Sequence, residues 1–573
     1  MVASSRKKGE SSSYSISRRS AIQPNAISRR CLRRYTSNRS RGGESLFLEE
    51  LPMSHNRSRR RFLQDVGRGT FLATLGSAAA IDLELVPTAF AKELDGELNF
   101  GELEPLVCLL QETPVARLQA TLVEKLRGGL PLKTLVAAGA LANARTFGGE
   151  DYIGFHTFMA LAPSFHMSSL MPAGAEALPV LKVLYRNSSR IQDFGGRDAE
   201  VLHAVPPSAS AGAAGANESL PAAIRGRNVQ QAEQLLAGLV ATDRQSALDA
   251  LIPAVHDTHP EVHRTVLPYR AWEMQEIVGT QHALTLLRQS LRYCVRAEPA
   301  NRPEMTAHGT MLVKLLDEFK LNGRTPGTKS ADDALVGHLS QTFATASAED
   351  AGRAAASALA EGFDPTAIGE AISLAASLLV LRDGGRLPQW EDRLKPAGTV
   401  HGDSVGVHAS DAANAWRNLA RVSSGRNTFA CLIIGAWQVA RDRNYPGNLL
   451  PEALPAKHHL DRLSDKDADG LLAKLSDAIQ NNLQGQATAI AARYGELSLP
   501  VERLFNTLVR YAVSEDGALH AEKYFQTVWD DYHSTRPAFR WRHLVSLARV
   551  TASEFGKPAA GQAEARELLG VRS

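Results

Sequence analysis

Apolar residues recur mainly three and four positions apart in this chain, and this spacing constrains its fold more than any other feature. It is clear in ARLQATLVEKL (116–126), QAEQLLAGLV (231–240) and AISLAASLLVL (371–381). Such spacing places the apolar side chains on one face of a helix, whereas the alternating β-branched runs of strands are scarce. The sequence therefore predicts a mainly α-helical protein, a multi-helix body built from repeated helix pairs.

Four segments interrupt the helical pattern with Pro, Gly and Ser, namely 205–221, 322–333, 384–399 and 444–456. Such composition is typical of loops. They are interpreted as surface loops within one helical body, or as including a joint near residue 325. We expect a single large domain or two closely packed helical halves, an N-terminal half (92–325) and a C-terminal half (326–573).

Residues 53–91 have the features of a twin-arginine export signal. Arg59 and Arg60 are followed by the spacer Arg61 and the apolar pair Phe62-Leu63, an uncharged stretch runs from Thr70 to Ile81, and Ala89-Phe90-Ala91 offers small residues to a signal peptidase. We expect cleavage before Lys92, with 1–52 an untranslated or disordered extension. The uncharged stretch is too short to span a membrane. The sequence thus predicts a periplasmic or secreted protein, exported by the twin-arginine machinery, with no stable membrane span after cleavage; the alternative is a basic tail.

The charge of the chain is unevenly distributed. Residues 1–91 hold 16 of the 64 Lys and Arg and 7 of the 61 Asp and Glu, so 48 basic and 54 acidic residues follow, a net charge of −6. We therefore expect no nucleic-acid partner. Three cysteines lie beyond the signal in apolar strings, without C-x-x-C spacing, which favours buried free thiols.

A weak internal repeat precedes several histidines. GLPLKTL (129–135), GFDPTAI (362–368) and GELSLPV (495–501) each predict that a glycine ends one helix and that another begins about four residues on. A degenerate fourth copy is ATDRQSA (241–247). Each copy leads into a histidine, so the histidines approach a common centre if the copies are structurally equivalent. The alternative is coincidence, because glycine-ended helices are common and the chain has 17 histidines.

Two of the histidine segments lie in the N-terminal half. His156, in DYIGFHTFMAL, is a candidate ligand, general base, or core histidine satisfied by Asp151 or a carbonyl. His166 is placed in a loop. The cluster HDTHPEVH (256–263) predicts a helix capped by His259, with His259 and His263 one turn apart and able to grip one metal. That helix is expected to continue as far as His282. The alternative is that His259 only caps the helix and that His263 is exposed to water.

The other two segments lie in the C-terminal half. His408 is surrounded by small residues, which permit close approach of a ligand or another helix. His520 and Lys523 share a helix face if a helix begins at Asp516 or Gly517, and the alternative is a charged helix start exposed to water.

Together these short motifs resemble the questin oxidase-like family. The matching strings, in order, are HTFMAL at His156, HPEVH at His259 and His263, VHASDAANAW at His408 and HAEK at His520. The resemblance implies an α-helical oxidoreductase, typified by fungal enzymes that open an anthraquinone ring in a Baeyer–Villiger type oxygenation with NADPH and molecular oxygen. No G-x-G-x-x-G follows a predicted strand, so a Rossmann-type nucleotide site is not expected.

We therefore expect an oxidoreductase acting on an aromatic or quinone-like small molecule, with imidazoles that bind a transition metal or act as acid and base. NADPH is implied only by the family resemblance. The expected catalytic residues are His156, His263, His408, His520 and Lys523, with Asp411 in support. The expected metal ligands are His156, His259, His263, His408 and His520. The alternative is a non-enzymatic helical repeat protein of the periplasm that binds a partner.

Overall fold

The computed structural model describes residues 96–207, 213–258, 260–298, 303–393, 395–400, 404–444 and 448–571. The export signal, the proposed cleavage site and residues 1–52 lie outside the described residues. Within them helices dominate, and extended pairing is limited to two isolated bridges, between Lys329 and Phe363 and between Glu515 and Pro558. The prediction of a mainly α-helical body is confirmed.

The chain up to residue 298 forms twelve α-helices among the described residues. They are α4 (Glu104–Glu112), α5 (Val115–Arg127), α6 (Leu132–Phe147), α7 (Tyr152–Ser168), α8 (Leu178–Phe194), α9 (Ala213–Arg225), α10 (Val229–Thr242), α11 (Arg244–Leu251), α12 (Pro253–His256), α13 (Val262–Glu273), α14 (Gln275–Val278) and α15 (Ala283–Arg296). Short 3₁₀ turns lie at Gly101–Leu103, Gly196–Ala199 and Thr280–His282.

The rest of the described chain continues in the same manner. Its helices are α16 (Pro303–Glu318), α17 (Asp333–Thr345), α18 (Ala348–Ala360), α19 (Pro365–Arg382), α20 (Val405–Val422), α21 (Arg426–Asp442), α22 (Lys457–Leu460), α23 (Ala468–Gln480), α24 (Gln484–Glu496), α25 (Val501–Ser514), α26 (His520–Ser534), α27 (Trp541–Glu554) and α28 (Gln562–Leu569). Two further 3₁₀ turns lie at Pro388–Trp390 and Gly517–Leu519.

Helices α19, α20 and α21 pack closely on one another and carry much of the core. Small residues make this approach possible, because a Cβ at Gly406 would lie 2.8 Å from the Cα of Val380. Helix α19 is long and apolar enough to cross a membrane, but 78% of it is buried inside the body, which is also what a core helix of a soluble protein shows.

The repeated segments form helix pairs, each followed by a histidine-bearing helix. Gly129 and Gly362 have the left-handed φ values of 92° and 85° and end α5 and α18 as expected. Gly495, however, lies inside α24, and the left-handed residue is Ser498 at φ 52°. The third prediction was therefore wrong in its turn residue: Gly495 makes room for the indole of Trp541, whose Cδ2 atom would lie 2.4 Å from a Cβ there.

Three other local predictions were wrong. Residues 213–221, expected to lie in a loop, belong to the helix α9, because alanines there favour a helix despite Pro221. His166 lies within α7 and not in a loop, since burial of this helix outweighs the donor missing at Pro163. The helix after His263 ends at Glu273, and Gly279, at φ 106°, separates the short α14 from the turn at His282.

Candidate active site

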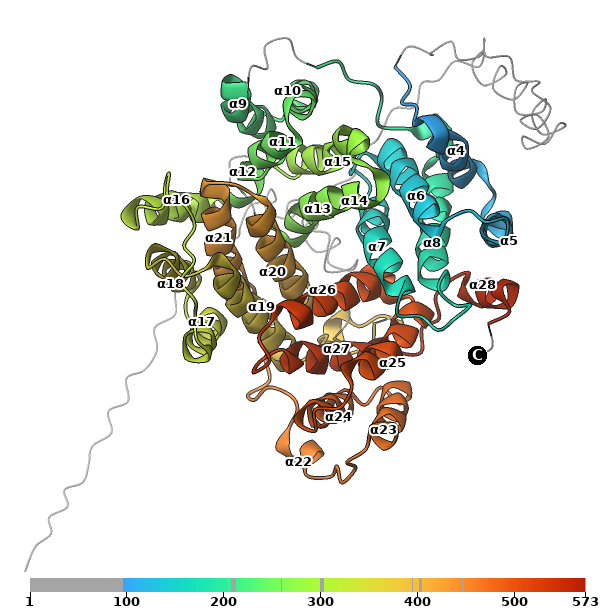
Figure 1. The fold of residues 1–573 in the computed structure, drawn as a ribbon, viewed down its shortest axis with the longest axis vertical. Helices are drawn as coiled ribbons and strands as arrows, with labels where there is room; N and C mark the ends of the chain where they lie inside the picture. The colour runs from blue at the N-terminus through green and yellow to red at the C-terminus, as the bar shows by residue number, and fades with distance from the viewer. Residues whose placement is uncertain are drawn as a thin grey trace, which may run out of the picture. The chain divides into compact units, whose positions relative to one another are not determined.

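Four helices surround the histidines singled out in the sequence. Helices α13 and α26 each pack against both α7 and α20 (Figure 1). Each of the four carries one histidine of a cluster that we call the histidine tetrad: His156 on α7, His263 on α13, His408 on α20 and His520 on α26. Two members come from each sequence half.

The tetrad consists of two imidazole pairs in contact. The Nε2 atoms of His156 and His263 lie 3.1 Å apart, and those of His408 and His520 lie 3.3 Å apart. Between the pairs, the ring centroids of His156 and His520 are 5.1 Å apart and those of His263 and His408 are 5.7 Å apart. The four expected histidines therefore meet at one place, in the buried interior, with His408 half-buried.

His156 is held as a neutral acceptor. Its Nδ1 lies 2.7 Å from the carbonyl oxygen of Tyr152, and because a carbonyl only accepts, Nδ1 carries the hydrogen. Burial, together with the charges of Lys523, His263 and other cations, lowers the pKa of His156 well below its ordinary value. Its Nε2 lone pair is therefore directed at His263. Of the roles considered for this histidine, the carbonyl contact is present, whereas Asp151 caps α7 through the amide of Gly154.

His263 must donate from both ring nitrogens. Its Nε2 faces the acceptor Nε2 of His156, and its Nδ1 lies 2.5 Å from Oε1 of Glu261. A ring with hydrogens on both nitrogens is an imidazolium. Burial raises the pKa of Glu261, but the charge and hydrogen bonds of His263, with a hydrogen bond from Tyr293, lower it well below its ordinary value. The centre thus pairs a neutral imidazole with a charged one that is neutralised by a carboxylate.

The contacts of Glu261 show that α13 begins at a different residue from the one expected. Its carboxylate accepts from the backbone amides of His263 and Arg264, at 3.0 and 3.2 Å, so Glu261 is the N-cap of α13. The helix begins at Val262, so the predicted cap at His259 was wrong. His259 itself lies outside the described residues, and its expected metal role stays a prediction.

In the second pair, as in the first, one imidazole accepts a hydrogen bond and the other donates it. Nδ1 of His520 lies 3.2 Å from the carbonyl oxygen of Ala518, so in the neutral ring Nε2 accepts and His408 donates. His520 is the first residue of α26, which follows the left-handed residues Ala518 and Leu519. A 3₁₀ turn begins at Gly517 and α26 itself begins at His520, and His520 is buried, so the alternative of a helix start exposed to water was wrong.

Aromatic rings adjoin the first pair. The ring of Tyr152 lies 4.4 Å from that of His156, and Phe155 lies 4.9 Å from His156 and 5.3 Å from His263, centroid to centroid. Tyr293 packs edge-on against Phe155 and donates to Glu261. These rings keep the pair away from water.

Lys523 and Asp411 lie one turn beyond the tetrad on α26 and α20 and are buried. Burial raises the pKa of Asp411, which Lys523 and a 2.8 Å hydrogen bond from Thr527 partly oppose. The same lysine charge acts on His156. Both residues named in the sequence therefore lie beside the tetrad.

The arrangement has a feature of metal ligands, since three imidazoles turn Nε2 inward and engage Nδ1 with a carbonyl or carboxylate. Within the described ranges, however, no group of three or more His, Cys, Asp or Glu side chains is placed to hold a metal ion. The inward nitrogens lie at hydrogen-bond distance in pairs. The transition metal stays a prediction, and the observed arrangement is two hydrogen-bonded imidazole pairs.

One partner of the centre and one buried ion pair of α26 were missed in the sequence. Glu261 stands two residues before His263, and the preference of helix starts for acidic residues was the signal available. The second is the buried ion pair between Glu522 on α26 and Lys182 on α8, with N–O 2.5 Å. Lys182 lies 340 positions earlier in an apolar helix, and no local pattern joins the two.

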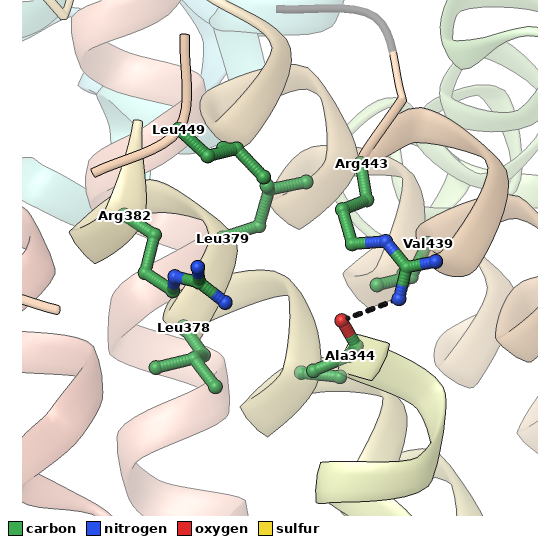
Figure 2. Close-up of a pocket in the computed structure, with 8 residues that line it drawn as sticks. Ala344, Leu378, Leu379, Arg382, Val439, Arg443 and Leu449 are labelled. Atoms are coloured by element: carbon green, nitrogen blue, oxygen red, sulfur yellow. Dashed lines mark hydrogen bonds between the residues drawn. The ribbon is translucent and has the colours of Figure 1, made fainter. Parts of the chain in front are cut away.

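Two small cavities lie elsewhere. One, of about 10 Å³, is lined by residues of α17, α19 and α21 and by Leu449; Figure 2 shows Arg443 donating to the carbonyl of Ala344 beside it. The other, of about 10 Å³, includes Ala521 and Tyr524 of α26. Each holds no more than about one water.

Comparison of the chain with protein-family models, curated proteins and solved structures returned no match.

Proposed function

We propose that this protein is an exported helical oxidoreductase of questin oxidase-like type, in which the histidine tetrad donates and accepts protons on an aromatic or quinone-like small molecule. One observation carries the proposal: the Nε2 atoms of His156 and His263 face each other at 3.1 Å in a buried site, and the contacts of their Nδ1 atoms assign a neutral ring to His156 and a charged ring to His263. A base and an acid of the same chemical type, held side by side, are suited to moving a proton in either direction.

The chemistry of the surroundings supports the proposed substrate class. Oxidation or reduction of a phenolic or quinone ring moves protons on and off oxygen, which imidazoles near neutral pH transfer well. The rings of Tyr152, Phe155 and Tyr293 beside the tetrad are compatible with a flat aromatic ligand. The order of the histidine motifs, which resembles that of the questin oxidase-like family, supports the redox class.

The electron source is separate from this proton centre. NADPH remains an implication of the family resemblance, and no described residue is assigned to it. A transition metal, if bound, would be held by tetrad imidazoles and would polarise a substrate oxygen. We assign the acid–base form because the inward nitrogens already satisfy one another in pairs.

Export by the twin-arginine route is part of the proposal. This route carries folded proteins. The tetrad spans 364 positions of the sequence, from His156 to His520, so its members come together only when the chain has folded. The periplasm or the medium is therefore the proposed location.

The competing proposal is a binding protein in which the tetrad only fills the core. It is favoured by one observation: three of the tetrad's Nδ1 atoms find a partner within the protein. Such a role makes the tetrad a stabilising element, and its replacement would reduce stability without a change in chemistry.

A panel of hydroxyanthraquinones, quinones and hydroquinones separates the two. Binding is followed by thermal shift and conversion by absorbance and oxygen uptake, with NADPH supplied, on the full chain before and after dialysis against a chelator. The proposal expects conversion of at least one compound and its loss in His156→Gln. The matched control is His543→Gln, a buried histidine away from the tetrad. Equal conversion in both variants, or no binding of any compound, would contradict the proposal.

A further inference from the structure

A polar stripe leaves the tetrad along α26. His520, Lys523, Thr527 and Asp530 are spaced three, four and three residues apart, so they lie on one face, with neighbouring Cβ atoms about 5–6 Å apart. The first three are buried and Asp530 is half-buried. Burying a row of polar side chains between packed helices costs desolvation free energy. A functional role explains why the row is there despite this cost.

A second stripe follows α13 in the same direction. His263, Arg270 and Glu273 are spaced seven and three residues apart. His263 to Glu273 and His520 to Asp530 each span ten residues, about 15 Å along a helix. His263 and His520 both lie against His156 at one end, and the charge of Glu273 acts on Asp530 at the other end, so the two stripes connect the same two places.

The two stripes are joined from α20. Asp411, one turn after His408, accepts a 2.8 Å hydrogen bond from Thr527. The charge of Lys523 acts on both Asp411 and His156, and the charge of Arg270 acts on both Asp411 and Asp530. Proton-carrying groups therefore follow one another at intervals of about one helical turn from Asp530 to the tetrad.

Glu273 and Asp530 form the outer end of the stripes. Both are half-buried, so this end meets solvent. Glu273 accepts from Arg270 at 2.6 Å and from the hydroxyl of Tyr269 at 3.4 Å. Asp530 accepts from Gln526 at 2.7 Å.

The charges around Asp530 come from each neighbouring helix. They are Glu273, Arg270 and Tyr269 on α13 and Asp531 on α26 itself, and Arg421 on α20 acts on Tyr269. Burial first, and then the charge of Glu273, raise the pKa of Asp530 to about 7, although Arg270 opposes the shift. Near neutral pH this carboxyl is thus able to take up and release a proton.

We propose that Asp530 and Glu273 are the solvent entry of a proton path that runs through Asp411 and Lys523 to the histidine tetrad. The inference rests on the proposed acid–base function, for which a buried centre must exchange protons with water after each cycle. A proton that binds the Asp530 carboxylate passes inward through Asp411 and Lys523 to His520, and each carrier returns to its starting state. No electron is transferred along this path.

The test measures proton exchange directly and needs no substrate. The full chain is labelled with ¹⁵N-histidine, and the exchange of the tetrad's imidazole N–H hydrogens with D₂O is followed by NMR at pH 7. Asp530→Asn and Glu273→Gln are expected to slow this exchange at least about tenfold, which is less than the roughly 10²–10⁴-fold effect of a positioned acid or base in catalysis. The matched control is Glu276→Gln, an exposed acid one turn beyond Glu273.

Melting temperatures measured on the same samples separate loss of the path from loss of the fold. Thr527→Val keeps the side-chain shape but removes the hydrogen bond to Asp411. It tests a position between Asp530 and the tetrad and is also expected to slow exchange. Exchange within about twofold of wild type in both acid variants would overturn the path. If the tetrad keeps its mixed protonation in that case, the proposed acid–base centre stands and only the path fails; if the mixed protonation is absent, the centre itself fails.

Discussion

Replacing Glu261 by Gln removes the negative charge that stabilises the His263 imidazolium. The carboxylate lies 2.5 Å from Nδ1, with the histidine side chain 10% and the glutamate side chain 26% exposed. Removing one partner of a buried ion pair costs about 3–5 kcal/mol, and the partial exposure of Glu261 places this pair at the lower end, about 3 kcal/mol. The amide oxygen still accepts a hydrogen bond at the helix start, so most of the loss is electrostatic.

The matched control is Asp332→Asn, the same acid-to-amide change at the exposed N-cap of α17, which is expected to cost less than about 1 kcal/mol. Free energies of unfolding are measured by denaturant titration at pH 7 and at lower pH. Because the folded-state pKa of Glu261 is lowered, its contribution is present above the unfolded value near 4.3 and is lost as the pH falls below it. Glu261→Gln should therefore approach wild type in acid. A cost at pH 7 equal to that of Asp332→Asn would refute the assigned charge of His263.

Three further outcomes are expected. His408→Ala, set among small residues, should leave the melting temperature within a few degrees but abolish conversion of any compound that the panel identifies; a large loss of stability with unchanged conversion would favour the structural role. Asp257→Asn should lower the free energy of unfolding by about 2 kcal/mol at pH 7, because burial raises the pKa of Asp257 but His256 and other groups outweigh it and lower the pKa to about 2. In denaturant titrations the difference between variant and wild type should vanish as the pH falls from about 4 to 2. Changing Arg59 and Arg60 together to Lys should retain the uncleaved precursor in the cytoplasm of a twin-arginine-competent host, whereas continued export in cell fractionation would contradict that route.

The helical class and the meeting of the four histidines could be predicted from the sequence. Apolar spacing specifies helices locally, and the repeated helix pairs before His156, His408 and His520 placed these residues on equivalent elements. In the structure α6, α19 and α25 pack against the histidine-bearing helix that follows each of them. A repeated local order was thus sufficient to indicate a common centre.

The protonation pattern could not be predicted, because it depends on contacts that the sequence does not record. The neutral state of His156 follows from burial and from Lys523, which lies 367 positions later. The charge of His263 follows from the acceptor lone pair of His156, 107 positions away. Local rules also failed at Gly495, where packing against Trp541, and not a turn, requires the glycine.

The most direct test of the central claim is the ¹⁵N NMR spectrum of the histidine side chains across pH. At pH 7 the contacts of the two rings require His263 to carry hydrogens on both nitrogens and His156 to carry one, on Nδ1, with assignments made from His263→Gln and His156→Gln. Because the pKa of His156 is lowered well below its ordinary value, its resonances should not titrate near pH 6.5. A spectrum in which both rings are neutral at pH 7, or in which His156 titrates near 6.5 like a free histidine, would contradict the acid–base pair.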